Sequence, residues 1–114
     1  MQNGYGLWIE VKMKWTFNKA AELDPQFPET FFNLGYIYAI IKDYSKAKEM
    51  YGRVVELAPS FLDEALFNLA VVHEKLGKRD MSIKNLEQAI TVNPKDGLAK
   101  KYLQHLNLKS GGDQ

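Results

Sequence analysis

The sequence repeats itself at a spacing of 34 to 35 residues, and this period constrains the fold more than any other feature. Leu23-Asp24-Pro25-Gln26-Phe27 recurs as Leu57-Ala58-Pro59-Ser60-Phe61 after 34 residues. Phe32-Asn33-Leu34-Gly35 recurs as Phe67-Asn68-Leu69-Ala70 after 35 residues. A period of this length indicates stacked copies of one supersecondary unit, because each copy buries its apolar face against its neighbours.

Each copy carries the apolar periodicity of two helices. Phe31, Leu34, Gly35 and Tyr38 recur at i, i+3, i+4 and i+7, which places them on one helical face. The second segment of this copy ends at Pro59, because proline lacks an amide donor and disfavours helical geometry before it. We expect no strand, and we expect helices over residues 7–23, 28–41, 44–57, 62–75, 79–92 and 97–108.

Several residues predict how these helices begin and end. Pro28 suits the first turn of a helix. Ser60 and Asp63, three residues apart, resemble a capping box. Gly77 suits a left-handed helix end. These signals place the turns between the same segments that the apolar periodicity separates.

The pattern resembles the tetratricopeptide repeat. The first copy fills its positions with Phe31, Leu34, Gly35, Tyr38, Ala47, Tyr51, Val54 and Pro59. The second copy fills them with Leu66, Leu69, Ala70, His73, Ser82, Leu86, Ala89 and Pro94. The sequence departs from the family pattern at Lys42 in the first copy, where glycine is usual. In the second copy it departs at His73, where an aromatic residue is usual, and at Ser82, where alanine is usual. The resemblance implies a small bacterial-type protein of that family, with an all-α, right-handed superhelical stack of antiparallel helix pairs.

The repeat divides the chain into segments. Upstream, Phe17, Ala20 and Pro25 match only the second helix of an earlier copy. The polar, glycine-rich end of the chain reads as disordered. We therefore expect an irregular N-terminus (1–6), a tetratricopeptide-like domain (7–108) and a disordered tail (109–114). The domain comprises a partial repeat (7–27), two repeats (28–61 and 62–96) and a capping helix (97–108).

Composition excludes several classes of function. The chain has no cysteine, so it has no disulfide, thiol chemistry or cysteine-based metal site. Its two histidines, His73 and His105, lie 32 positions apart and lack a second ligand at metal spacing. We read His73 as a packing residue. With no glycine-rich phosphate loop, we expect no catalysis and no cofactor.

Charge and hydropathy set the expected environment. Fifteen basic and fourteen acidic residues create no global field that would attract nucleic acid or an anionic membrane. The longest apolar run, Leu34–Ile41, is far shorter than the ~20 residues that span a bilayer. We therefore expect a cytoplasmic protein that does not enter the membrane.

The first helix of the first repeat has a second apolar stripe formed by Phe32, Tyr36, Ala39 and Ile40. Because a surface helix needs only one buried face, this helix is either sandwiched or presents a binding surface. The resemblance implies that the stripe faces a concave ligand groove. The implied groove also contains Asn33, Phe67, Asn68, Val71, Glu74, Lys101 and His105. The alternatives are packing of the phenylalanines between adjacent first helices, and plain solvation or a helix-to-helix hydrogen bond for the asparagines.

The leading function is a non-catalytic scaffold that binds a partner peptide or helix in this aromatic groove. Phe32 and Phe67 stand where the family's clamp for a chaperone carboxylate tail would need polar or basic residues, so we expect no such clamp. One alternative is a single-stranded RNA adaptor that uses Lys100, Lys101 and Tyr102. Another is a self-associating structural module.

The predicted N-terminal helix carries an apolar stripe of Leu7, Trp8, Val11 and Trp15 with no partner helix in the chain. Two tryptophans can each bury about 150–250 Å², so an uncovered stripe would be a large patch. We expect a homodimer through this helix, since a two-fold axis lets one stripe cover itself. The alternatives are a lid formed by residues 1–6 and a chain that is a fragment of a longer array.

Overall fold

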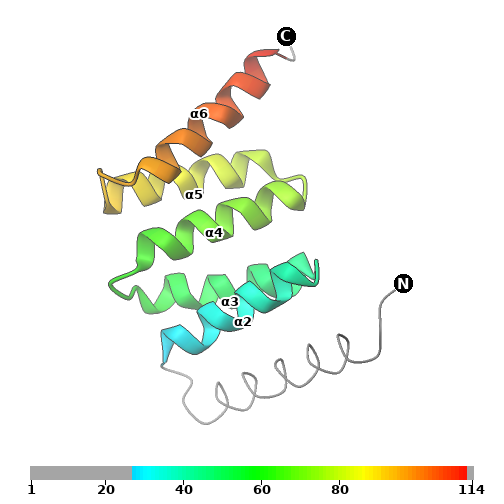
Figure 1. The fold of residues 1–114 in the computed structure, drawn as a ribbon, viewed down its shortest axis with the longest axis vertical. Coiled ribbons are helices and arrows are strands. Elements are labelled where there is room, and N and C mark those ends of the chain that lie inside the picture. Colours follow the sequence, from blue (N-terminus) through cyan, green and yellow to red (C-terminus); the bar gives the residue numbers. More distant parts are fainter. Residues whose placement is uncertain (1–26, 113–114) are drawn as a thin grey trace.

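The computed structural model describes residues 27–112, which form five helices and no strand. The helices are α2 (Pro28–Ile40), α3 (Tyr44–Leu57), α4 (Leu62–Lys75), α5 (Arg79–Val92) and α6 (Gly97–Gly112). Each packs on the next along the chain, so α2–α3 and α4–α5 form two stacked pairs that α6 follows (Figure 1). The predicted all-α stack of helix pairs is confirmed.

The helix bounds follow the apolar periodicity closely. Helices α3, α4 and α5 have the predicted bounds, and α2 ends at Ile40, one residue before the predicted end. The prediction was wrong at the C-terminus, where residues 109–112 continue α6 instead of forming a disordered tail. Lys109 and Ser110 tolerate helical geometry and no proline follows Leu108, so nothing in this sequence stops the helix there.

The turns within the two pairs have the same geometry but different residues. Lys42 has a φ of 65° after α2, and Gly77 has a φ of 79° at the equivalent place after α4. Gly77 thus takes the predicted left-handed conformation, whereas Lys42 adopts it at a cost of about 1–2 kcal/mol. Asp43 Oδ1 then accepts a hydrogen bond from the Lys46 amide at 3.3 Å, which caps α3.

The start of α4 differs from the predicted capping box. Phe61 is the N-cap residue, and no side chain caps the helix. The extra residue in this repeat moves the helix start beyond reach of Ser60. Asp63 Oδ2 instead accepts a hydrogen bond from Asn93 Nδ2 at 3.0 Å, which ties the start of α4 to the end of α5. Pro28 does occupy the first turn of α2, as predicted.

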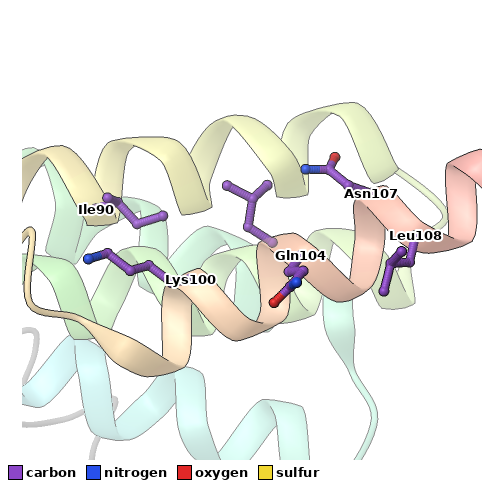
Figure 2. Close-up of a pocket in the computed structure, with 6 residues that line it drawn as sticks. Ile90, Lys100, Gln104, Asn107 and Leu108 are labelled. Atoms are coloured by element: carbon purple, nitrogen blue, oxygen red, sulfur yellow. The ribbon is translucent and has the colours of Figure 1, made fainter.

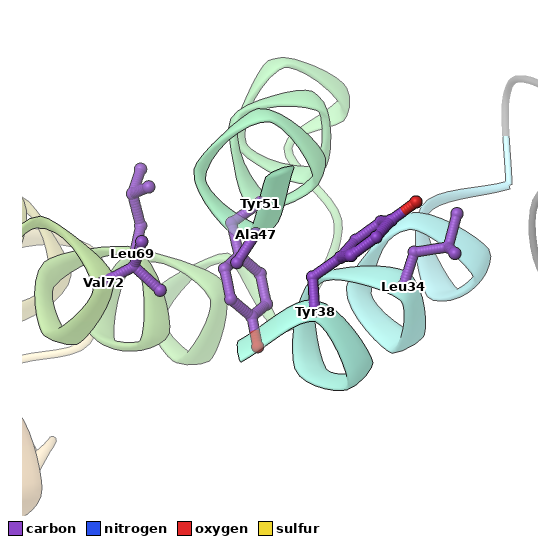
Figure 3. Packing of buried hydrophobic residues seen from close by; sticks show 6 residues of the cluster. All are labelled: Leu34, Tyr38, Ala47, Tyr51, Leu69 and Val72. Carbon is purple, nitrogen blue, oxygen red and sulfur yellow. The ribbon is translucent and has the colours of Figure 1, made fainter. Parts of the chain in front are cut away.

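The first repeat is held together by a close contact between Gly35 and Tyr51. A Cβ atom added to Gly35 would lie 2.7 Å from Tyr51 Cε1, which is closer than carbon atoms can pack. Only glycine therefore lets the ring of Tyr51 lie against α2. This ring joins a buried apolar cluster that connects α2, α3 and α4 (Figure 3). The cluster consists of Leu34, Tyr38, Ala47, Tyr51, Leu69 and Val72.

The second repeat buries polar groups as well as apolar ones. His73 is 5% exposed, and its Nδ1–H donates to Asn85 Oδ1 at 2.6 Å, because an amide oxygen can only accept. Burial lowers the pKa of His73, and Lys48 and Lys78 lower it further, against the opposing hydrogen bond to Asn85. The hydroxyl of Ser82 is buried without a hydrogen-bond partner. His73 is thus a packing residue, as predicted.

The predictions for residues 1–26, which include the irregular N-terminus (1–6) and nearly all of the partial repeat (7–27), lie outside the described segment. The predicted helix over 7–23, with Leu7, Trp8, Val11 and Trp15, lies outside residues 27–112, so the homodimer stays a prediction. Within residues 27–112, none of the helices combines the length and the apolar character that crossing a bilayer requires.

Candidate functional site

A cavity of about 350 Å³ opens between α2 and α4, above the ring of Tyr51 from α3. Tyr36 and Ala39 contribute from α2, and Phe67, Asn68 and Val71 contribute from α4. Four side chains complete the lining, namely Tyr44, Tyr51, Val72 and Lys75. The wall is mostly apolar and contains four aromatic rings, which is the composition of a site for an apolar side chain. We call this cavity the α2/α4 pocket.

Two polar groups lie at the base of the α2/α4 pocket. Asn68 Nδ2 donates a long hydrogen bond of 3.5 Å to the hydroxyl oxygen of Tyr51. Burial raises the pKa of Tyr51 to about 12, so this hydroxyl keeps its proton at neutral pH. Among residues 27–112, no acceptor takes that proton. Tyr51 itself is only 2% exposed, so its side chain forms part of the pocket wall.

The predicted second apolar stripe lies on α2, and only some of its residues line the pocket. Tyr36, 58% exposed, and Ala39 line the pocket. Phe32 is half-buried and packs edge-on against Tyr51 at 5.7 Å and Phe61 at 5.4 Å between ring centroids. Phe32 therefore packs on α3 and on the residue before α4, and its packing between adjacent first helices stays a prediction. Asn33 and Ile40 are exposed beyond the lining.

The predicted groove residues on α4 and α6 are joined by direct contacts. Phe67 meets Tyr102 edge-on at 5.7 Å, and the Tyr102 hydroxyl donates to Glu74 Oε1 at 2.6 Å. Burial and the bond to Glu74 raise the pKa of Tyr102. His105 lies beside Tyr102 at 6.3 Å between ring centroids. These contacts join α4 to α6, and of the side chains in them only Phe67 lines the α2/α4 pocket.

These contacts also bear on the RNA alternative. Tyr102 is half-buried, and its ring and hydroxyl contact Phe67 and Glu74. Base stacking needs an exposed ring face beside basic residues. Lys100 and Lys101 are exposed, but the ring of Tyr102 beside them is half-buried and already in contact with other side chains. The case for a single-stranded RNA adaptor is therefore weaker than the sequence suggested.

Sequence reasoning missed four lining residues of the pocket. Tyr44, Tyr51 and Val72 belong to the core stripes, and the sequence does not show that their edges reach a surface. Lys75 follows Val71 by one helical turn on α4, so the spacing alone could have placed it on the groove face. It is exposed and has no ion pair within residues 27–112.

A second cavity of about 330 Å³ lies between α5 and α6 (Figure 2). Its lining mixes aliphatic and polar side chains and has no aromatic ring, consisting of Ile90, Lys100, Leu103, Gln104, Asn107 and Leu108. Aromatic anchors carry much of the energy in protein interfaces, so the α2/α4 pocket is the stronger candidate. Residues 27–112 contain no cluster of three acidic, histidine or cysteine side chains that could hold a metal.

The fold and this pocket define a solenoid of helix pairs with a concave aromatic site. The tetratricopeptide repeat family model matches residues 28–61, and a second model of the same family matches residues 63–96. The chain therefore belongs to the tetratricopeptide repeat family. No comparison tests the predicted bacterial type.

Individual relatives agree with this assignment. The chain is 37% identical over 71 residues to the small glutamine-rich tetratricopeptide repeat-containing protein 2 of Mycosarcoma maydis, a match that covers 61% of this chain and 20% of that protein. It spans a fifth or less of the length of such curated relatives.

Two solved structures share the fold. The crystal structure of MamA has a TM-score of 0.84 and 20% identity, over 94% of this chain and 62% of that one. The first repeat domain of Spaghetti (RPAP3), bound to the HSP90 peptide SRMEEVD, has a TM-score of 0.82 and 18% identity, over 94% of this chain and 84% of that one. Likeness at this identity shows the fold alone.

Proposed function

We propose that this chain is a non-catalytic protein–protein interaction module that binds a peptide or helix of a partner protein in the α2/α4 pocket and along the face around it. The carrying observation is the cavity of about 350 Å³ with four rings, open on the face that the first helices of both repeats share. Tyrosine-rich walls supply rigid contact area at low entropic cost, as interface hot spots do.

The contacts give the predicted groove residues four different roles. Tyr36, Ala39, Asn68 and Val71 line the pocket and would touch the partner. Phe32 and Phe67 pack on neighbouring rings and would hold the walls in place. Asn33, Ile40, Lys101 and His105 would form an outer rim, and Glu74 would hold α6 through Tyr102.

The proposed partner differs from the peptide of the Spaghetti structure. That domain binds a peptide with the sequence SRMEEVD. A clamp for a terminal carboxylate needs several basic side chains, whereas the lining of the α2/α4 pocket contains one, Lys75. We therefore assign the pocket to an internal segment of a partner.

Site-specific photocrosslinking tests the proposal. Tyr36→p-benzoylphenylalanine places a crosslinker in the pocket, and Met81→p-benzoylphenylalanine places one on α5, where the exposed Met81 is not part of the lining of the α2/α4 pocket. In lysate of the source organism, we expect position 36 to yield a discrete adduct that position 81 does not. Tyr36→Ser with Val71→Ser should abolish capture by the unmodified chain. Equal capture by this double variant overturns the groove assignment.

A homodimer through Leu7, Trp8, Val11 and Trp15 is part of the proposal, supported by the apolar stripe that these four residues form in the sequence. Light scattering after size exclusion at tens of micromolar tests it, and a clean monomer contradicts it. If a dimer forms, Trp8→Glu with Trp15→Glu should dissociate it. The proposal also places the module in the cytoplasm, which fluorescence microscopy of a tagged chain tests.

A further inference from the structure

Two opposite kinds of side chain could occupy the α2/α4 pocket. Four aromatic rings around one cavity could hold a cation, because the face of a ring is negative. The same wall could hold an uncharged apolar side chain, because its surface is mostly carbon. The charge around the rings decides between these two occupants.

The fixed charge at the pocket is positive. Lys75 is the only charged side chain in the lining, and it has no ion pair within residues 27–112. Its neighbour Glu74 is bonded to Tyr102 on the α6 side, 2.6 Å from that hydroxyl, and does not line the cavity. The phenols of Tyr36, Tyr44 and Tyr51 are neutral side chains. A cation in the pocket would therefore meet a like charge and no carboxylate.

We infer that the α2/α4 pocket takes one large uncharged side chain, such as phenylalanine, from an internal peptide segment, and that Lys75 selects segments with an acidic residue beside that anchor. This inference rests on the proposed function and specifies its ligand. Asn68 is half-buried and lines the pocket, where its side-chain amide can bond the backbone of the segment. The cavity of about 350 Å³ has room for a single aromatic anchor of this kind.

Titration of the full chain with short synthetic peptides tests this inference. The three probes are acetyl-Gly-Ser-Phe-Xaa-Ser-Gly-amide with Xaa as glutamate, glutamine or lysine. Amide chemical shifts in ¹⁵N NMR spectra measure weak affinities and report where each probe binds. We expect shifts at Tyr36, Ala39, Val71 and Lys75, with glutamate tighter than glutamine by about two- to fivefold, as for exposed ion pairs, and lysine weakest.

Two variants isolate the charge of Lys75. In Lys75→Gln the glutamate and glutamine probes should bind equally, which is the result expected if the ion pair is the whole difference. Lys84→Gln removes an exposed lysine from α5, away from the pocket, and should keep the preference for glutamate. Raising the salt concentration should reduce the preference in the unmodified chain.

The contrary outcomes are distinct from failure of the proposed function. A lysine probe that binds as well as the glutamate probe, or better, overturns charge selection while leaving the groove assignment intact. Absence of shifts at the pocket with every probe overturns the anchor site, whatever photocrosslinking shows. Concentration-dependent shifts of the same amides without peptide would make a second copy the occupant and also overturn the inference.

Discussion

The two complete repeats have the same helix pair but fill it differently. In the first repeat, Gly35 lets the ring of Tyr51 lie against α2, and the edge of that ring becomes the base of the α2/α4 pocket. In the second repeat the equivalent positions hold Ala70 and Leu86, both buried in an apolar cluster. The glycine–tyrosine pair of the first repeat therefore contributes a ring to the pocket wall, and residues of the second repeat complete that wall.

The second repeat carries polar groups where the first carries apolar ones. His73 and Ser82 occupy the places of Tyr38 and Ala47, and both are buried. A buried polar group costs stability unless a hydrogen bond compensates it. Asn85 compensates His73, whereas Ser82 Oγ has no partner. The comparison shows that the family fold tolerates a less favourable core in one repeat when its neighbours complete the stack.

The largest expected effect comes from breaking the glycine–tyrosine pair. Gly35→Ala should destabilise the protein by about 1–3 kcal/mol, because the added Cβ forces the ring of Tyr51 to move. Urea unfolding followed by circular dichroism measures the loss. Adding Tyr51→Leu, which copies the pair of the second repeat, should recover part of it. Strict additivity of the two changes would contradict the proposed contact.

Acid should weaken the second repeat. The folded state lowers the pKa of His73 below its ordinary value near 6.5, so the unfolded chain binds more protons as the pH falls. The stabilising contribution is complete above about pH 6.5 and is lost as the pH falls through the folded-state pKa. We expect a smaller loss than in Gly35→Ala.

Urea unfolding between pH 7.5 and 5 measures this dependence on acid. His73→Phe, which restores an aromatic residue, should flatten the profile between these values. An identical slope in both proteins would show that His73 does not titrate differently on folding.

Ser82→Ala should stabilise the protein by about 1 kcal/mol. The change removes a buried hydroxyl that has no hydrogen-bond partner and adds the better helix former. The reverse exchange in the first repeat, Ala47→Ser, should destabilise by a similar amount, since Ala47 is fully buried. Thermal unfolding of the two variants side by side tests both. A neutral Ser82→Ala would mean that the hydroxyl finds a partner.

Lys42→Gly should have the smallest effect, a gain of about 0.5 kcal/mol. Relief of the left-handed conformation at a φ of 65° favours glycine by about 1–2 kcal/mol, and the added freedom of the unfolded chain opposes it by about 0.4–1 kcal/mol. Gly77→Ala reverses the exchange in the second repeat and should be destabilising. If both changes are neutral, the two turns do not differ in strain.

Local signals in the sequence determined the helices and the stack. The 34- to 35-residue period, Pro28, Pro59, Pro94 and Gly77 predicted the bounds of α3, α4 and α5 without error, because proline and glycine act on the backbone wherever they occur. The prediction failed at Ser60 and at residues 109–112. At Ser60 the prediction failed because a cap requires one side chain to reach one particular amide. At residues 109–112 it failed because polar residues can continue a helix when no stop signal precedes them.

The pocket was decided by tertiary packing. Periodicity placed Tyr36, Ala39 and Val71 on one face, but it could not show that Phe32 turns onto Tyr51 and Phe61 or that Tyr102 bonds Glu74. These contacts join side chains 19 to 29 positions apart. Their geometry depends on how the helices cross and on which rotamers fit, and a single sequence does not encode either property locally. The helices were thus readable from the residues themselves, whereas the site arises only where the two repeats meet.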